Sequence, residues 1–217
     1  MKTLRHASTE AADTLPVLLP GAYMTPQHFV EAGFLAAMDA RHAPFDLAIP
    51  ALDLENITDG SALPMIREEL LAAARQRYRR VWLGGISLGG FLSLLHAARH
   101  GNEIDGLCLF APYPGSRITT KAITAAGGLA AWQATTEQLA DPEFELWDWL
   151  RRAPANLPIH IDYGLEDRFA SGMAQLAAAL PQAATRTQPG GHDWLVWQQA
   201  WEHFLDTGPL CGNGVSA

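Results

Sequence analysis

A serine between two glycines is the feature of this sequence that most directly indicates chemistry. Residues 85–89 read Gly-Ile-Ser-Leu-Gly, between the apolar run 81–83 and a helical pattern over 91–96. A strand, a sharp turn and a helix in this order form the G-x-S-x-G elbow, which holds a serine hydroxyl clear of the backbone. Glycines are needed there because side chains would collide where strand and helix crowd together. Ser87 is therefore a candidate nucleophile, and the alternative is a glycine-rich turn with an incidental serine.

Two later segments supply the residue types that a serine nucleophile needs. Serine is a weak nucleophile at neutral pH and requires a base within hydrogen-bond reach. Residues 164–167 read Gly-Leu-Glu-Asp, and residues 190–194 read Gly-Gly-His-Asp-Trp. His192 differs from the other histidines because two glycines let its loop fold back, whereas the others stand in terminal, helical or core-strand contexts typical of structural groups. Its neighbour Asp193 is expected to cap the helix that follows.

Short apolar runs alternate along the chain with longer helical patterns. This alternation indicates a parallel sheet covered by helices on both faces. Strands are predicted at 17–20, 47–51, 81–85, 107–111, 159–163 and, more weakly, 184–187. Helices are predicted from Pro26 with Thr25 as N-cap, over 62–78, from the elbow to about residue 100, over 172–180, and from residue 194 onward.

The pattern resembles the α/β-hydrolase superfamily over nearly the whole chain. The order Ser, Asp, His is that of the superfamily, and Gly-Gly-His-Asp-Trp with Trp197 is similar to the C-terminal signature of compact serine esterases of the esterase-D-like and carboxylesterase kind. The resemblance implies a mostly parallel sheet of about six strands flanked by helices, the third to eighth of the usual set. The first two strands are expected to be missing, because few residues precede Val17. It also implies one domain, 1–217, with a lid-like helical insertion at 114–157, between the sixth and seventh strands of the usual set.

The resemblance also assigns roles to the candidate residues. Ser87 would attack a carbonyl carbon, with His192 as the base and Asp167 orienting the imidazole. Asp167 is favoured over Glu166 because the acid of the superfamily follows a glycine by about three residues. Asp162 lies within a predicted strand and is expected to be structural.

An acyl-transfer site also needs hydrogen-bond donors for the oxyanion of the tetrahedral intermediate. By resemblance, one donor is the backbone N–H of Leu88. The second would come from the loop after the first predicted strand, where Ala22 or Tyr23 is the candidate. Many relatives have His-Gly where this chain has Pro20-Gly21, but no donor is lost because the backbone donates. The alternative is an ordinary loop in which the glycine permits the turn.

The seven tryptophans fall into two groups. Four are expected to pack in the core: Trp82, Trp194, Trp197 and Trp201. The other three, Trp132, Trp147 and Trp149, lie in the 114–157 segment, where they are candidate substrate-binding residues that line an acyl pocket. The equal alternative is packing of the insertion against the body.

Composition excludes several classes of function. A formal net charge of −8 argues against a nucleic-acid partner, and no apolar run is long enough to span a bilayer. The first residues lack the pattern of a secretory signal. Only Cys108 and Cys211 are present, so a disulfide framework is not expected and a cytoplasmic location is predicted. Neither a phosphate-binding loop of the Walker type nor the paired ligands of a zinc site occur, so no metal or cofactor is expected.

The sequence therefore predicts a serine hydrolase that cleaves a small-molecule carboxylic ester or thioester through an acyl-enzyme. A lipase or an amide hydrolase with the same triad is one alternative. A non-catalytic protein that keeps the fold as a binding module is another. The retained serine, histidine and elbow glycines favour an enzyme.

Overall fold

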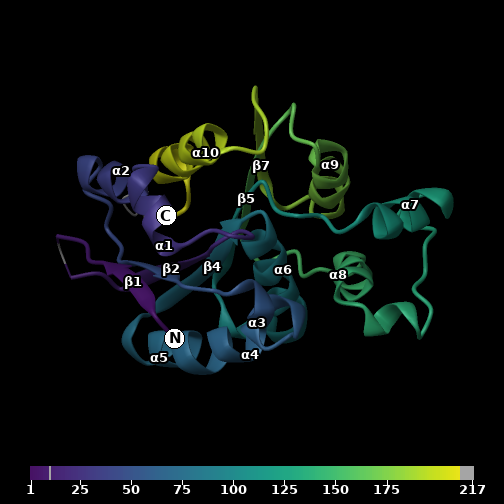
Figure 1. Cartoon of the computed structure of the whole chain (residues 1–217), viewed down its shortest axis with the longest axis horizontal. Helices are drawn as coiled ribbons and strands as arrows, with labels where there is room; N and C mark the ends of the chain where they lie inside the picture. The colour runs from purple at the N-terminus through teal and green to yellow at the C-terminus, as the bar shows by residue number, and fades with distance from the viewer. Residues whose placement is uncertain (10, 211–217) are drawn as a thin grey trace.

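The computed structural model describes residues 1–9 and 11–210, and a seven-stranded sheet forms its centre (Figure 1). From one edge to the other, the strands are β1 (Thr3–His6), β3 (Leu47–Pro50), β2 (Thr14–Leu19), β4 (Arg80–Ile86), β5 (Gly106–Phe110), β6 (Ile159–Gly164) and β7 (Ala184–Gln188). All neighbouring strands pair in parallel except β1, which runs antiparallel to β3. The strands in the middle of the sheet are buried along their length, which is why they appear in the sequence as continuous apolar runs.

The sheet has one strand more than the six expected. The six predicted strands are confirmed within a few residues, and β1 is the addition. Its register places Thr3 opposite Pro50 and His6 opposite Leu47. None of its four residues is fully buried, so the sequence shows no continuous apolar run there. The segment before β2 thus supplies one of the two strands that we expected to be missing.

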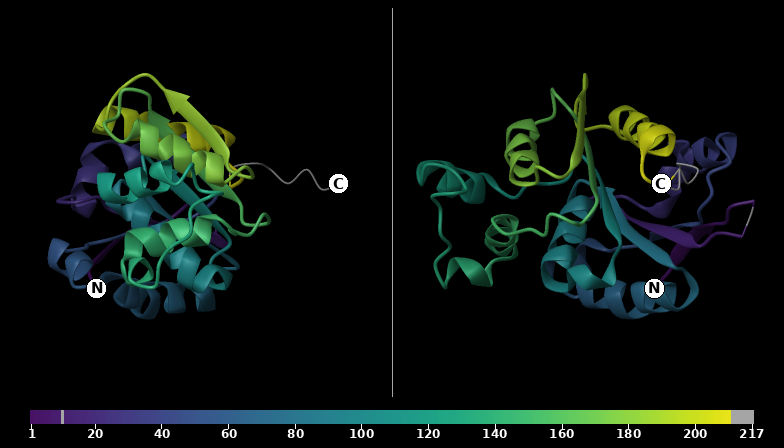
Figure 2. Two further views of the ribbon diagram at one scale, coloured as in Figure 1. Left: turned by 90° about the vertical axis from the view of Figure 1, so that its right-hand side faces the viewer. Right: turned by 180° about the vertical axis from the view of Figure 1, so that it is seen from behind.

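Helices cover both faces of the sheet (Figures 1 and 2). One face carries α1 (Pro26–Glu31), α2 (Phe34–Ala40) and α10 (Trp194–Thr207). The other carries α5 (Ala72–Arg77), α6 (Leu88–His100) and α9 (Ala170–Ala179), with α3 (Leu54–Thr58) and α4 (Ala62–Met65) before α5. A π-helical stretch, Ile66–Leu71, joins α4 to α5. The arrangement is that of an α/β protein with a doubly covered sheet.

The first helical region differs from the prediction in one respect. Thr25 and Pro26 begin α1 as the sequence indicated. The apolar positions that continue the helical spacing belong, however, to a second helix, because Gly33 adopts a φ of 80° and separates α1 from α2. A left-handed backbone at this residue ends one helix and starts another at a new angle.

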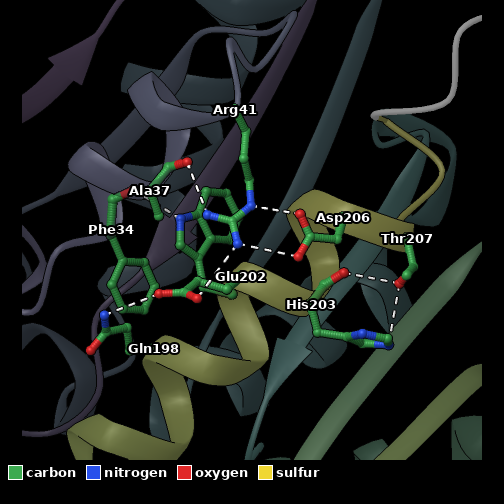
Figure 3. A network of polar contacts seen from close by, with 9 residues as sticks. Phe34, Ala37, Arg41, Gln198, Glu202, His203, Asp206 and Thr207 are labelled. Carbon is green, nitrogen blue, oxygen red and sulfur yellow. Dashed lines mark hydrogen bonds and ion pairs between the residues drawn. The ribbon is translucent and has the colours of Figure 1, made fainter.

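Aromatic packing and an ion-pair network fix α10 against α2. Trp201 is fully buried, stacks on Phe34 at 5.6 Å and donates its indole N–H to the Phe34 carbonyl at 3.0 Å. At the surface, Arg41, which directly follows α2, bonds Asp206 through Nε at 2.6 Å and lies 3.5 Å from Glu202 (Figure 3). The predicted core role of the four tryptophans is confirmed: Trp82, Trp197 and Trp201 are buried, and Trp194 packs against the core.

The 114–157 segment lies between β5 and β6 and contains α7 (Arg117–Ala125), a short 3-10 turn at Gln138–Ala140 and α8 (Pro142–Leu150). It extends away from the sheet beside α9 and α6 (Figure 2). Glu143 of α8 anchors it, since its carboxylate accepts hydrogen bonds from Tyr113 Oη at 3.0 Å, the Ser116 amide at 2.7 Å and Thr119 Oγ1 at 2.6 Å. The division into a single domain, 1–217, with this segment as a lid-like insertion stays a prediction.

Across residues 1–9 and 11–210, no helix is long and apolar enough to cross a membrane. In the same residues, no group of three or more His, Cys, Asp or Glu side chains could hold a metal ion. Cys108 is buried in β5, where burial raises the pKa of its thiol. Cys211 lies outside the described residues. The cytoplasmic location stays a prediction.

Candidate active site

Ser87 stands between the end of β4 and the start of α6 in a conformation that few residues adopt. Its φ is 53° and its ψ is −114°, a region that is costly for a residue with a side chain. Its neighbours hold it there: the Ser87 amide donates to the Phe110 carbonyl at 3.1 Å, and its carbonyl accepts from the Tyr113 amide at 2.9 Å. The sheet and the loop after β5 therefore maintain the strained turn.

The elbow glycines have the steric role that the sequence indicated. A Cβ atom on Gly85 would lie 2.3 Å from the Leu19 carbonyl oxygen, and one on Gly89 would lie 2.0 Å from the same atom. The end of β2 thus crosses directly against the turn. Only residues without a side chain fit at these two positions.

The three residues of the predicted triad lie in one hydrogen-bonded row. The His192 Nε2 atom is 2.9 Å from Ser87 Oγ, and its Nδ1 atom is 2.5 Å from Asp167 Oδ2. The other carboxylate oxygen of Asp167 accepts the Phe169 amide at 2.8 Å. A proton on Nδ1 that faces the carboxylate leaves Nε2 free to accept the serine proton. The arrangement has the connectivity that general-base activation of a serine requires.

Two aromatic rings hold the imidazole of His192 in place. Phe169 and Trp197 present their rings nearly perpendicular to it, with centroids at 5.3 Å and 5.0 Å. The His192 side chain is left 12% exposed, while the Asp167 side chain is fully buried. Edge-to-face contacts of this kind are favourable and help to fix the orientation of the imidazole.

Backbone and side-chain bonds join the loop of the acid to the loop of the histidine. The Glu166 amide donates to the Gly190 carbonyl at 3.0 Å, and the Glu166 carboxylate accepts the Gly190 amide. The Leu165 amide donates to the Gln188 carbonyl at 2.8 Å. Gly190 has a φ of 119°, which glycine adopts without strain. The sequence indicates Glu166 only as an alternative acid and gives no signal for its bond to Gly190.

The other acidic candidates are structural, as predicted. Asp162 is buried in β6, where Arg186 Nη1 lies 2.7 Å from Oδ2 and Gln188 Nε2 lies 3.3 Å from Oδ1. Burial raises the pKa of Asp162, although the arginine opposes that rise. Asp193 caps α10 by accepting the amides of Leu195 and Val196.

The loop that carries the second oxyanion candidate lies against the elbow. A Cβ atom on Gly21 would be 3.2 Å from the Ile86 carbonyl oxygen. Tyr23 has a φ of 61° and its side chain is strongly exposed. Within the described part of the chain, the amides of Ala22 and Tyr23 donate no hydrogen bond. The Leu88 amide opens α6 and has no acceptor within the helix. These amides are thus available, and their donor roles stay predictions.

The tryptophans of the insertion have packing contacts of their own. Trp132 is buried and stacks on Phe144 at 5.9 Å. Trp147 is fully buried, donates its indole N–H to the Pro114 carbonyl at 2.8 Å, and lines a cavity of about 870 Å³. Trp149 is half-buried. Since none of the contacts described joins these rings to Ser87, their substrate-binding role stays a prediction.

Comparison with known proteins adds to this geometry. No protein-family model matches the chain, and no curated protein matches it in sequence. Several solved structures have a backbone fold similar to that of this chain. A ferulic acid esterase matches with a TM-score of 0.61 at 15% identity, over 92% of this chain and 85% of that chain. The serine hydrolase FphF of Staphylococcus aureus has a TM-score of 0.63 at 12% identity, over 95% and 86%. Est1E from Butyrivibrio proteoclasticus has a TM-score of 0.63 at 15% identity, over 94% and 91%.

The chain has the α/β-hydrolase fold. Within this fold, the aromatic shell around His192 is the part of the candidate site that sequence reasoning missed. Tyr113 places its ring 5.3 Å from that of Phe169, and Phe169 in turn contacts His192. Phe169 follows the predicted acid by two residues, and that proximity was the available signal. Nothing local marked Tyr113, because its position depends on the loop after β5.

Proposed function

We propose that this protein is a serine hydrolase that cleaves a carboxylic ester or thioester through the triad Ser87, His192 and Asp167. The observation that carries the proposal is the continuous row of hydrogen bonds from Asp167 through His192 to Ser87 Oγ. Asp167 follows β6, His192 follows β7 and Ser87 follows β4. These parallel strands have their carboxyl ends at the same edge of the sheet. That edge is where open α/β sheets bind their ligands.

The row supports a two-step reaction. His192 Nε2 takes the hydroxyl proton while Ser87 Oγ attacks the carbonyl carbon, and the buried Asp167 carboxylate stabilises the imidazolium that forms. His192 then returns the proton to the leaving alcohol or thiol as the tetrahedral intermediate collapses to an acyl-enzyme. Water activated by the same imidazole releases the acid and restores the serine. The sum of both steps is hydrolysis, with no change of oxidation state.

Backbone amides would stabilise the tetrahedral intermediate. The Leu88 amide begins α6, where the helix dipole adds positive potential. The amide of Ala22 or Tyr23 would be the second donor, because their loop lies against the elbow.

The similar structures support hydrolysis but leave the substrate open. They include a ferulic acid esterase and an S-formylglutathione hydrolase from Staphylococcus aureus. One name is that of an esterase and the other that of a thioester hydrolase, which is why both bond types remain in the proposal. At 15% and 12% identity, neither sets the acyl group that this chain accepts.

The test is hydrolysis of nitrophenyl esters and acyl-CoA thioesters of graded chain length by the wild type and by Ser87→Ala. We expect kcat to fall by a factor on the order of 10⁴ or more, because the nucleophile is lost. Ser93→Ala is the matched control, since Ser93 lies on α6 with its hydroxyl bonded to the Gly89 carbonyl at 2.8 Å. Equal activity of Ser87→Ala and wild type would contradict the proposal. Long triacylglycerols and amides are added to the same panel. Turnover of only one of these two classes would favour the lipase or the amide hydrolase, and no turnover of any substrate would favour a binding module.

A further inference from the structure

Three basic side chains line a cavity that shares a wall with the candidate site. The cavity has a volume of about 710 Å³ and lies between α7 and α9, and its lining includes Arg117, Lys121, Arg168 and Phe169. The Phe169 ring contacts the imidazole of His192. Arg168 lies over that same ring, with its guanidinium carbon 4.7 Å from the centroid. One aromatic side chain thus separates the basic cavity from the catalytic row.

These three basic side chains have no carboxylate ion-pair partner among the residues that the structure describes. In the part of the chain that the structure describes, most other arginines form ion pairs with carboxylates, for example Arg67 with Glu103. Arg117, Lys121 and Arg168 form none there. The described residues that line the cavity include no Asp or Glu.

A local excess of positive charge is unusual in this protein. The whole chain has a formal net charge of −8. Glu143, the carboxylate beside α7, is directed to the Tyr113 hydroxyl and to the Ser116 and Thr119 groups rather than into the cavity. A hollow with cations on its wall concentrates positive potential and attracts anions. Arginine and lysine also supply the donors that carboxylates and phosphates prefer.

We propose that the substrate carries an anionic group, a carboxylate or a phosphate, which this cavity binds while the ester or thioester bond lies over Ser87. The inference rests on the proposed function and adds a substrate class to it. Hydroxyl and amide groups on the same wall, Ser116, Thr120, Ser171 and Gln175, complete a polar lining. Thr124 and Gln175 also line the 870 Å³ cavity beside Trp147, so a longer substrate has adjoining space.

The test compares charged and neutral substrates of the same shape. The 4-nitrophenyl half-ester of glutaric acid is paired with 4-nitrophenyl pentanoate, which places the charge in the acyl part. 4-Acetoxybenzoic acid is paired with its methyl ester, which places the charge in the leaving group. For each pair the quantity measured is the ratio of kcat/KM for the anion to kcat/KM for the neutral partner, so a general loss of activity cancels.

We expect at least one pair to favour the anion in the wild type. The ratio for that pair should fall in the double variant Arg117→Gln/Lys121→Gln and in the single variant Arg168→Gln. In the triple variant, which combines all three substitutions, it should fall by about tenfold. Raising the ionic strength should lower the ratio in the wild type and have little effect in the triple variant. The matched control is Arg79→Gln, which removes an exposed positive charge before β4, and its ratio should equal that of the wild type.

The outcomes separate the two proposals. Hydrolysis of the neutral esters with ratios that are the same in every variant would overturn the inference and leave the proposed function standing. Absence of hydrolysis of every ester would overturn both. Inhibition by inorganic phosphate, compared with inhibition by glutarate at equal ionic strength, shows which anion the cavity prefers.

Discussion

At the scale of single residues, two buried aspartates, one within β6 and one in the loop after it, have different partners. Asp167 has one oxygen on His192 and one on the Phe169 amide. Asp162 is bonded instead by Arg186 and Gln188. The first is connected to the nucleophile through the imidazole, and the second only to the sheet. Their replacement should therefore have separate consequences.

Asp167→Asn should lower kcat by a factor on the order of 10⁴ with little change in KM. An amide that faces Nδ1 favours the wrong tautomer, which weakens the transition state rather than substrate binding. The measurement is steady-state kinetics on a nitrophenyl ester. A kcat close to that of the wild type would remove Asp167 from the triad.

Asp162→Asn is the matched control, and we expect it to act through stability. It leaves Arg186 without its charged partner and should lower the free energy of unfolding by about 1–3 kcal/mol. Urea unfolding and kinetics on the same samples separate the two effects. A large loss of kcat in Asp162→Asn with a normal rate in Asp167→Asn would place the acid within the strand.

Glu166 should act as a positioning residue for the histidine loop. Glu166→Ala removes the acceptor of the Gly190 amide and should lower kcat about tenfold with KM nearly unchanged, because the imidazole is held less well. Glu166→Gln keeps an acceptor oxygen and should restore most of the rate. A merely structural role would lower stability in the alanine variant without this rescue of kcat.

At this scale the sequence identified residues whose role depends on local spacing. The glycines around Ser87 and before His192 mark turns that any chain must make with glycine, so those positions were predictable. The bond from Glu166 to Gly190 joins segments separated by a helix and a strand. The sequence contains no local signal for such a pair.

At the scale of elements, the insertion contains the residues that we expect to select the acyl group. Trp147 of α8 both lines the 870 Å³ cavity and bonds the Pro114 carbonyl. Trp132 packs on Phe144 and is absent from that lining. The two rings therefore make a matched pair for a test of the predicted substrate-binding role.

Trp147→Ala should change the chain-length preference, and Trp132→Ala should not. Each methylene of the acyl group that is no longer buried costs about 0.8 kcal/mol, so octanoyl esters should lose more kcat/KM than acetyl esters. Trp132→Ala should lower the melting temperature and reduce activity on all chain lengths in proportion. Chain-length ratios unchanged in Trp147→Ala would mean that the ring only packs, and that the acyl pocket lies elsewhere.

Elements were predictable where burial makes them continuous in the sequence. The buried strands β4, β5 and β6 were found for that reason. The edge strand β1 was missed because pairing with β3, rather than its own composition, makes it a strand. The break between α1 and α2 was missed because a single glycine within a helical pattern is compatible with either one helix or two.

At the scale of the whole molecule, two buried histidines make stability depend on pH. Burial lowers the pKa of His96 to about 4, and nearby His100 adds to that shift. Burial also lowers the pKa of His160 to about 4, with His203 contributing. In the unfolded chain these two histidines titrate near pH 6.5, so between pH 6.5 and 4 the unfolded chain binds protons that the folded chain does not bind. The contribution of these two neutral histidines to the free energy of unfolding is therefore complete above pH 6.5, and it is lost as the pH falls toward 4.

We expect the free energy of unfolding to decrease between pH 6.5 and pH 4 by about 3 kcal/mol for each of the two histidines. In the described residues, neither ring nitrogen of His96 and not Nε2 of His160 has a hydrogen-bond partner. The double variant His96→Leu/His160→Leu therefore removes two titrating groups without breaking a hydrogen bond at these three nitrogen atoms. Urea unfolding at half-unit pH steps should give a flatter curve for the double variant, and an equally steep curve would assign the acid sensitivity to other groups.

The overall fold was predictable because alternating strand and helix patterns leave few arrangements for a parallel sheet. The location of the basic cavity was not. Arg117 and Lys121 are close in sequence, but Arg168 comes to the same wall only when α7 lies beside α9. That packing places α7 of the insertion beside residues far away in the sequence, and no local pattern predicts such a contact.

Covalent labelling shows whether Ser87 is the activated nucleophile of this protein. The wild-type protein is reacted with a fluorophosphonate, which labels a serine activated by a neighbouring base, and the digested peptides are mapped by mass spectrometry. We expect one adduct per chain, on Ser87, and its disappearance in His192→Ala, where the base is gone. An adduct on Ser93 or Ser116, or no adduct on a folded and soluble sample, would contradict it.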